Sequence, residues 1–185
     1  RTLPPIEKPC FVCISNDQAK HFDAIHGKEA RVAYNGIDMD FYRPLNLKRT
    51  NRFLFLARFS KVKSPDLAIE ACKEAGVGLD LVGDTQLTGE PEYLQSIIKM
   101  GDGKQIRFVG PASRGECVHW YSQAHCMVHP TFHFREPMGL APIEAMSCGV
   151  PVVTTPLGNA IDAKENSEIL IAKTSEEFAA KIQEL

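Results

Sequence analysis

From residue 52 to the end of the chain, short apolar runs alternate with segments whose apolar residues recur at helical spacing. Residues 52–57 are almost continuously apolar, which is typical of a parallel strand covered on both faces. A helix is predicted to begin at Ser64-Pro65 and to end at Gly76. Further strands are expected at residues 79–82, 106–109, 126–128, 151–154 and 169–171, and further helices after Pro91, after a Ser113/Glu116 capping box and after Ser175. This order predicts an α/β fold with a doubly wound parallel sheet.

The first fifty residues follow a less regular pattern. We expect, in chain order, irregular structure over residues 1–9, a buried strand over 10–14, a helix capped by Ser15 or Asn16 and ended by Gly27, a short strand over 31–34, a turn over 35–38 and a polar linker over 42–51. The regular strand–helix rhythm therefore begins only at residue 52, after this polar linker.

Residues 135–149 combine a tight bend with two carboxylates. Gly139 allows the backbone to turn, Pro142 suits the first turn of a helix, and Gly149 suits its end. Glu136 precedes the bend and Glu144 lies in the helix, so both are expected to face one cavity at the helix N-terminus.

The chemistry of such a cavity suits a nucleotide sugar. The free N–H groups at a helix N-terminus favour an anion such as a diphosphate. Carboxylates do not bind phosphate, but they accept hydrogen bonds from sugar hydroxyls. The alternative interpretation is two surface glutamates beside an ordinary helix cap.

Polar residues also follow the predicted strands, at the sheet edge where doubly wound folds bind ligands. Arg58 and Lys63 follow the first strand and supply the two cations that a diphosphate needs. Lys61, between them, is interpreted as a solvated surface charge. The remaining candidates for donor contacts are Gly83 after the second strand, Gly110 after the third, and His129 and His133 after the fourth.

The bulk composition excludes several classes of function. A net charge of −2 and a pI near 6.3 argue against a nucleic-acid partner. No apolar run approaches the roughly 20 residues of a membrane span. The chain has neither a signal peptide nor an initiating Met, so a fragment of a longer cytoplasmic protein is expected.

The 6 cysteines are scattered among apolar residues, which predicts buried, reduced thiols. Cys10 and Cys13 have the spacing of half a zinc site or of a redox pair, but core packing is preferred because no second pair exists. The His and Cys residues between 117 and 133 match no standard zinc pattern, so no metal is expected.

Short motifs along the chain resemble, in their order, those of retaining glycosyltransferases of family four, which have the GT-B fold. The matching stretches are Tyr34-Asn35-Gly36-Ile37-Asp38 with Phe41 and Pro44, Ala57-Arg58-Phe59 to Lys63, His129-Pro130-Thr131 to Leu140, the Glu136/Glu144 pair, and Pro151-Val152-Val153 with Gly158. The chain departs from the family pattern at Ala57, Ser64, Met138, Asn159 and Asp162.

The resemblance implies a division of the chain and a role for each matched residue. Residues 1–44 would be the tail of an N-terminal domain with the interdomain linker, and residues 45–185 a Rossmann-like nucleotide-sugar-binding domain, the C-terminal half of a GT-B fold. Arg58 and Lys63 would bind the diphosphate, assisted by the bend residues Met138, Gly139 and Leu140. Glu136 would position the donor sugar and Glu144 the ribose. The base would lie near Gly83 and Gly110.

The implied activity is transfer of a hexose from a UDP- or GDP-sugar to a saccharide, lipid or small-molecule acceptor, with no cofactor or metal. Most of the N-terminal domain is missing, so this chain alone is expected to bind the donor weakly and not to turn over. The full-length protein would be cytoplasmic and peripheral to a membrane. Two other interpretations stay open: a non-catalytic nucleotide-sugar-binding module, and a relative of sugar-nucleotide epimerases.

Overall fold

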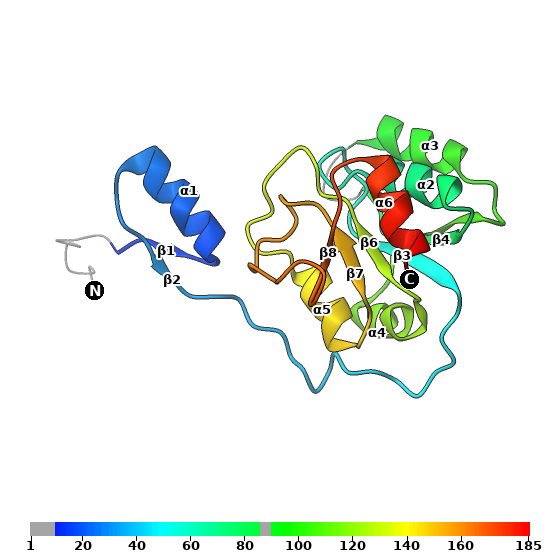
Figure 1. Ribbon diagram of the computed structural model, residues 1–185, viewed down its shortest axis with the longest axis horizontal. Coiled ribbons are helices and arrows are strands. Elements are labelled where there is room, and N and C mark those ends of the chain that lie inside the picture. The colour runs from blue at the N-terminus through cyan, green and yellow to red at the C-terminus, as the bar shows by residue number, and fades with distance from the viewer. Residues whose placement is uncertain (1–9, 86–89) are drawn as a thin grey trace, which may run out of the picture.

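A computed structural model describes residues 10–85 and 90–185, and its main feature is a sheet of six parallel strands (Figure 1). The strands lie in the order β5-β4-β3-β6-β7-β8. They are β3 (Arg52–Leu56), β4 (Gly78–Val82), β5 (Ile106–Gly110), β6 (Met127–His129), β7 (Val152–Thr154) and β8 (Leu170–Ile171). Within this sheet, the chain forms β3 first and then adds β4 and β5 on one side of it. It then crosses back and adds β6, β7 and β8 on the other side of β3. The topological switch point therefore lies between β3 and β6, and the predicted doubly wound α/β fold is confirmed.

Helices cover both faces of this sheet. They are α2 (Pro65–Glu74), α3 (Pro91–Met100), α4 (Arg114–Gln123), α5 (Leu140–Ser147) and α6 (Ser175–Gln183). Side chains alternate between the faces along β3, because successive strand residues point to opposite sides. Phe53 and Phe55 join the core under α2, α3 and α6, whereas Leu54 joins the core under α4 and α5. This two-sided burial explains why residues 52–57 form a continuous apolar run.

Most local signals read from the sequence are confirmed at the helix ends. The Ser113/Glu116 capping box is formed at α4. The last helix differs from expectation: its N-cap is Thr174, whose hydroxyl accepts from the Glu177 backbone N–H at 3.3 Å, and Ser175 is already the first helical residue. Two adjacent hydroxyl residues both satisfy the N-cap preference, and only the backbone conformation distinguishes them.

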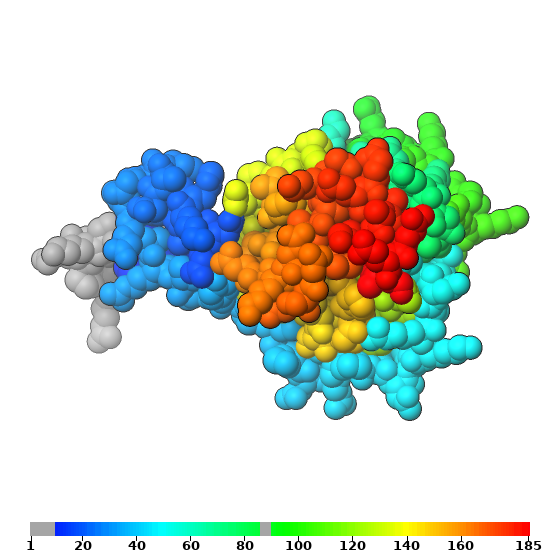
Figure 2. Space-filling model, in the orientation of Figure 1, coloured from blue at the N-terminus to red at the C-terminus, as the bar shows by residue number. Residues whose placement is uncertain are grey.

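The N-terminal part is a small, separate unit of β1 (Val12–Cys13), α1 (Asn16–His26) and β2 (Arg31–Val32). Ser15 caps α1 and Gly27 ends it in the left-handed conformation, as predicted. The strand expected over residues 10–14 is shorter and only half buried: β1 buries Cys13 but leaves Val12 58% exposed, and α1 contains no buried residue. Figure 2 shows this unit beside the larger body rather than within it.

Residues 33–51 contain no helix or strand but are held against the larger domain (Figure 1). Tyr42 is buried among the residues under α4 and α5, and its carbonyl accepts from the Ser147 hydroxyl at 2.5 Å. The Leu45 backbone N–H donates to the Ser122 hydroxyl at 3.0 Å. The predicted linker, residues 42–51, therefore packs against the larger domain.

The structure also tests the expectations of buried thiols and of no membrane-spanning segment. All 6 cysteines are free; four are buried, but Cys10 is exposed and Cys117 is half-buried, so the prediction of uniformly buried thiols is wrong for these two. Cys10 lies two residues before β1, which pairs with β2 alone among the described strands. Among the described helices, none is both long and apolar enough to span a bilayer.

Candidate functional site

A cleft of about 440 Å³ opens at the carboxyl edge of the sheet, at the switch point between β3 and β6. It is lined by residues from four places in the chain: Arg58 and Lys63 after β3, His129 at the end of β6, the bend before α5, and the N-terminal segment. The bend contributes Glu136, Pro137, Met138, Gly139, Leu140 and Ala141. Seven of the predicted site residues therefore meet in one cavity, while Lys61 is exposed and outside it, as expected.

The start of α5 shapes one wall of the cleft. Gly139 is the N-cap and adopts φ 72° and ψ 73°, which confirms the predicted bend. A Cβ at this position would lie 3.2 Å from Cγ of Glu136, so glycine is required both by the backbone and by the close approach. No side chain caps this end. The first N–H groups of α5 are therefore available to an anion in the cleft.

Lys63 and Glu136 form an ion pair inside the cleft, through Lys63 Nζ and Glu136 Oε2. Their side chains are only 13% and 16% exposed. The Glu136 backbone is anchored by its N–H, which donates to the Leu157 carbonyl at 3.1 Å. Arg58 is exposed at the same cleft, and within the described chain its guanidinium has no hydrogen-bond or ion-pair partner.

His129 lies behind Lys63 as a fully buried imidazole. Burial, with a smaller contribution from the Lys63 charge, lowers the pKa of His129 to about 3. Its Nε2 lies 3.1 Å from the Thr131 hydroxyl, and its carbonyl accepts from the Thr154 hydroxyl at 2.7 Å. His129 is therefore neutral at physiological pH and shapes the cleft without adding positive charge.

Glu144 does not line this cleft, so the expectation that both glutamates face one cavity is wrong for this structure. Its Oε2 accepts from the Tyr121 hydroxyl of α4 at 3.0 Å. Burial, and then the Glu144 charge, raise the pKa of Tyr121 far above its usual range. The rotation of α5 explains the placement: Pro142 and Ala145 are the buried residues of this helix, and Glu144 lies beside them on the side toward α4.

Gly83 and Gly110 also lie outside the cleft lining, at the ends of β4 and β5. The Gly83 N–H donates to the Gly110 carbonyl at 2.8 Å. Gly83 has φ 150°, and a Cβ there would collide with the Ala57 carbonyl. The three strand ends therefore pack closely, which explains the glycine at position 83.

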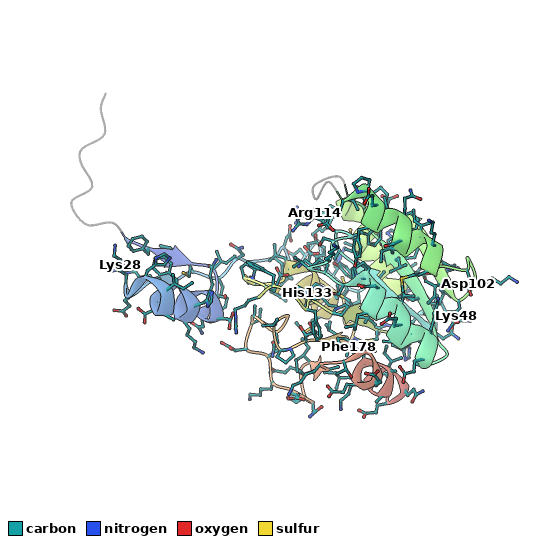
Figure 3. The ribbon with its side chains drawn as sticks, turned by 90° about the horizontal axis from the view of Figure 1, so that it is seen from above. Lys28, Lys48, Asp102, Arg114, His133 and Phe178 are labelled. Carbon is teal, nitrogen blue, oxygen red and sulfur yellow. The ribbon has the colours of Figure 1, made fainter. Side chains whose placement is uncertain are left out.

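His133 lies in a different cavity, of about 410 Å³, between α1 and the loop before α5 (Figure 3). Its neighbours there include His21 of α1 and the apolar residues Phe134 and Leu157. The structure therefore separates His133 from the cleft that holds Glu136, although the sequence places both residues in the same loop.

Contacts from the N-terminal unit were not anticipated from the sequence. The Ser15 hydroxyl donates to the Pro137 carbonyl, and Asp17 pairs with Arg135. The Asn35 N–H donates to the sulfur of Met138 at 3.2 Å. The one signal that could have indicated them is the position of Ser15, which follows a strand end just as Arg58 does.

Two departures from the family pattern have a structural explanation. Ser64, where glycine is usual, adopts φ 47° and ψ 55°, and its hydroxyl donates to the Lys61 carbonyl at 2.9 Å. Asn159 forms two hydrogen bonds to the backbone of Ala163, at 2.9 and 3.0 Å, and so closes the loop that follows β7.

Within residues 10–85 and 90–185, no three His, Cys, Asp or Glu side chains group as a metal site.

Sequence comparisons identify related proteins. The profile of the family "Glycosyl transferases group 1" matches residues 40–185. The D-inositol 3-phosphate glycosyltransferase of Frankia alni is 30% identical over 149 residues, which cover 69% of this chain and 36% of that protein. The corresponding protein of Streptomyces avermitilis is 26% identical over 167 residues, which cover 78% of this chain and 35% of that protein. The chain thus spans about a third of the length of these relatives.

Solved structures share the fold. Anabaena HepE, in complex with UDP and glucose, superposes with a TM-score of 0.82 at 23% identity, covering 95% of this chain and 52% of that one. Sucrose-phosphate synthase from Thermosynechococcus elongatus superposes with a TM-score of 0.77 at 23% identity, covering 95% and 48% of the two chains. These likenesses confirm the expected fold class.

Proposed function

This chain belongs to the glycosyl transferases group 1 and has the Rossmann-like fold of a GT-B C-terminal half, and from this premise we propose that it is a donor-binding domain. The donor would be a nucleoside diphosphate sugar, UDP- or GDP-linked, and the transferred group a hexose. The observation that carries the proposal is the cleft at the start of α5, where Arg58, Lys63 and Glu136 meet.

The cleft suits the diphosphate because it combines two cations with free helix N–H groups. When the glycosidic bond breaks, negative charge builds up on the leaving diphosphate. Arg58, Lys63 and the N–H groups of Leu140 and Ala141, which line the cleft, would stabilise this charge. Glu136 would hold the sugar through its hydroxyls. Since the two cations supply the charge neutralisation, the proposal requires no metal or cofactor.

The nucleoside would extend from the diphosphate toward α4. We assign Glu144 to the ribose hydroxyls and Tyr121, which donates to it, to holding the carboxylate in place. The base would lie over the packed ends of β4 and β5 near Gly83 and Gly110. His133, separated from the cleft, is no longer assigned to the donor.

The N-terminal unit of β1, α1 and β2 is proposed to belong to a further domain, and residues 33–44 to be the linker that joins this domain to residues 45–185. A two-stranded sheet and one helix without buried residues do not form a stable unit in water. Exposed apolar side chains at Val12, Ile25 and Val32 are consistent with a missing neighbour. That domain would supply the acceptor site, so the chain alone is expected to bind donor without turnover. The family-four assignment and retention of anomeric configuration belong to this proposal.

Calorimetric titration of the chain with UDP, GDP and ADP, each free and glucose-linked, tests the proposal. One base series should bind, and Glu144→Gln should weaken it about tenfold through the lost charge-assisted hydrogen bonds to ribose. Glu70→Gln, an exposed charge on α2, is the matched control and should have no effect. An epimerase relative would bind nucleotide independently of Glu144. A non-catalytic module would bind nucleotide in the same way as an enzyme. Its full-length protein, however, would show no transferase turnover that Glu136→Ala could lower.

A further inference from the structure

One of the two cations of the cleft already forms an ion pair with a carboxylate of the same cleft before any ligand binds. Lys63 is paired with Glu136, and both side chains are largely removed from water. His129, which packs near Lys63, is neutral and fully buried. Arg58 is the second cation of the cleft and lies at its exposed rim. A diphosphate that binds Lys63 must therefore compete with the carboxylate of Glu136.

The loop geometry restricts how Glu136 can respond. Its backbone is held by the hydrogen bond to Leu157, and its Cγ lies against Gly139. When a diphosphate displaces it, the side chain can turn, but the carboxylate stays inside the cleft. A half-buried carboxylate without a donor group is destabilised, and a neighbouring diphosphate adds repulsion.

A sugar on the diphosphate changes this balance. Its hydroxyls donate hydrogen bonds to the displaced carboxylate and replace the bond lost from Lys63. A free nucleoside diphosphate has no hydroxyls beyond its terminal phosphate, and its ribose hydroxyls are assigned to Glu144, so it offers no donor to the displaced carboxylate of Glu136. The same ion pair therefore opposes the two ligands to different degrees.

We propose that Glu136 is a specificity determinant that competes for Lys63 and so disfavours the free nucleoside diphosphate relative to the nucleotide sugar. This inference rests on the proposed function. It gives Glu136 a second consequence beyond positioning the sugar: once the sugar has left, the carboxylate reclaims Lys63 and promotes release of the nucleotide product.

Titration of the Glu136→Gln variant tests this inference. The change keeps the shape and a hydrogen-bond acceptor but removes the charge that holds Lys63. The free diphosphate of the preferred base should bind about tenfold more tightly, and its glucose conjugate should change by less than about threefold. In a Lys63→Met background the same Glu136→Gln change should tighten binding clearly less, because the competition for Lys63 is absent and only the repulsion between carboxylate and diphosphate is relieved.

Asp17→Asn is the matched control, since it neutralises the other carboxylate paired with a cation of this loop, Arg135, outside the cleft. It should leave both affinities unchanged. Equal tightening for the two ligands in Glu136→Gln, tightening of undiminished size in the Lys63→Met background, or tightening in Asp17→Asn would each overturn the inference while leaving the proposed function standing. Failure of the unmodified chain to bind any of these nucleotides would remove both. Fluorescence of Trp120, the 1 tryptophan in the chain, reports that each variant is folded.

Discussion

The two edges of the sheet hold charge clusters of the same composition, two cations and one carboxylate, with opposite properties. At the amino edge, Asp80 of β4 is bound by Arg52 and Arg107 from the neighbouring strands. Arg107 donates to both carboxylate oxygens at 2.6 and 2.8 Å, and Arg52 donates to both at 3.0 Å. Asp80 is only 7% exposed, and the adjoining cavity is about 120 Å³.

At the carboxyl edge, the carboxylate of Glu136 has one charged partner, Lys63, and Arg58 is left open to a cavity of about 440 Å³. The Arg52 guanidinium, in contrast, also donates to the Leu79 and Gln105 carbonyls at 2.8 and 3.0 Å. Charge composition therefore does not distinguish a structural cluster from a ligand site. The two clusters differ instead in how many hydrogen-bond partners their charged side chains have and in the volume of the adjoining cavity.

The comparison predicts its largest effect at Asp80. Asp80→Asn should lower the free energy of unfolding by about 3 kcal/mol, because it leaves Arg52 without a compensating charge in a largely buried position. Urea denaturation followed by Trp120 fluorescence measures this. Glu136→Gln is the matched change at the other edge and should cost less than about 1 kcal/mol. Equal losses in the two variants would show that the edges do not differ.

Arg58→Ala should produce the reverse pattern. Binding of the preferred nucleoside diphosphate should weaken about thirtyfold, because an unpartnered guanidinium makes its charge-assisted hydrogen bonds only with the ligand. Stability should hardly change. Arg107→Ala is the control, expected to lose stability and retain affinity; calorimetric titration and denaturation of both variants separate the two roles. Unchanged affinity in Arg58→Ala would exclude this arginine from the site.

The open edge also differs in backbone strain. Ser64, next to Lys63, is held at φ 47°, where a side chain is disfavoured. Ser64→Ala keeps the strain and loses the hydrogen bond to Lys61, so it should destabilise. Ser64→Gly also loses this hydrogen bond but relieves the strain, so it should exceed Ser64→Ala in free energy of unfolding by about 1 kcal/mol. If thermal denaturation ranks glycine at or below alanine, the loop is not strained.

The smallest expected effect concerns how the stability contributed by Asp80 changes with acid pH. Burial raises the pKa of Asp80, but the hydrogen bonds from Arg107 and Arg52 outweigh it, so the pKa lies below its usual value of 3.8. This stabilisation is complete above the unfolded-state pKa and is lost as the pH falls through the folded-state pKa. Between about pH 4 and pH 2, Asp80→Asn should therefore lose stability less steeply than the unmodified chain, by at most about 1.4 kcal/mol per pH unit. Parallel curves in denaturation series would contradict this.

Local sequence signals determined most of the fold. The apolar run through Phe53 and Phe55, the Ser113/Glu116 capping box and the bend at Gly139 all formed as predicted. Each depends on residues a few positions apart, so periodicity and turn chemistry are sufficient to find it. The same logic placed Arg58, Lys63 and Glu136 at one sheet edge, because parallel strands end together.

Only the tertiary structure decided how these side chains are paired. The ion pair of Lys63 with Glu136 joins residues 73 positions apart, and the bond of Ser15 to Pro137 spans 122. The rotation of α5 turned Glu144 toward Tyr121, a choice made by packing of Pro142 and Ala145 against the sheet. A sequence pattern specifies which face of an element is apolar, but the partner of each polar side chain depends on how separate elements pack. That is why the sequence placed Arg58, Lys63 and Glu136 near one another without showing which of them are paired, and why it did not indicate the cluster around Asp80 at all.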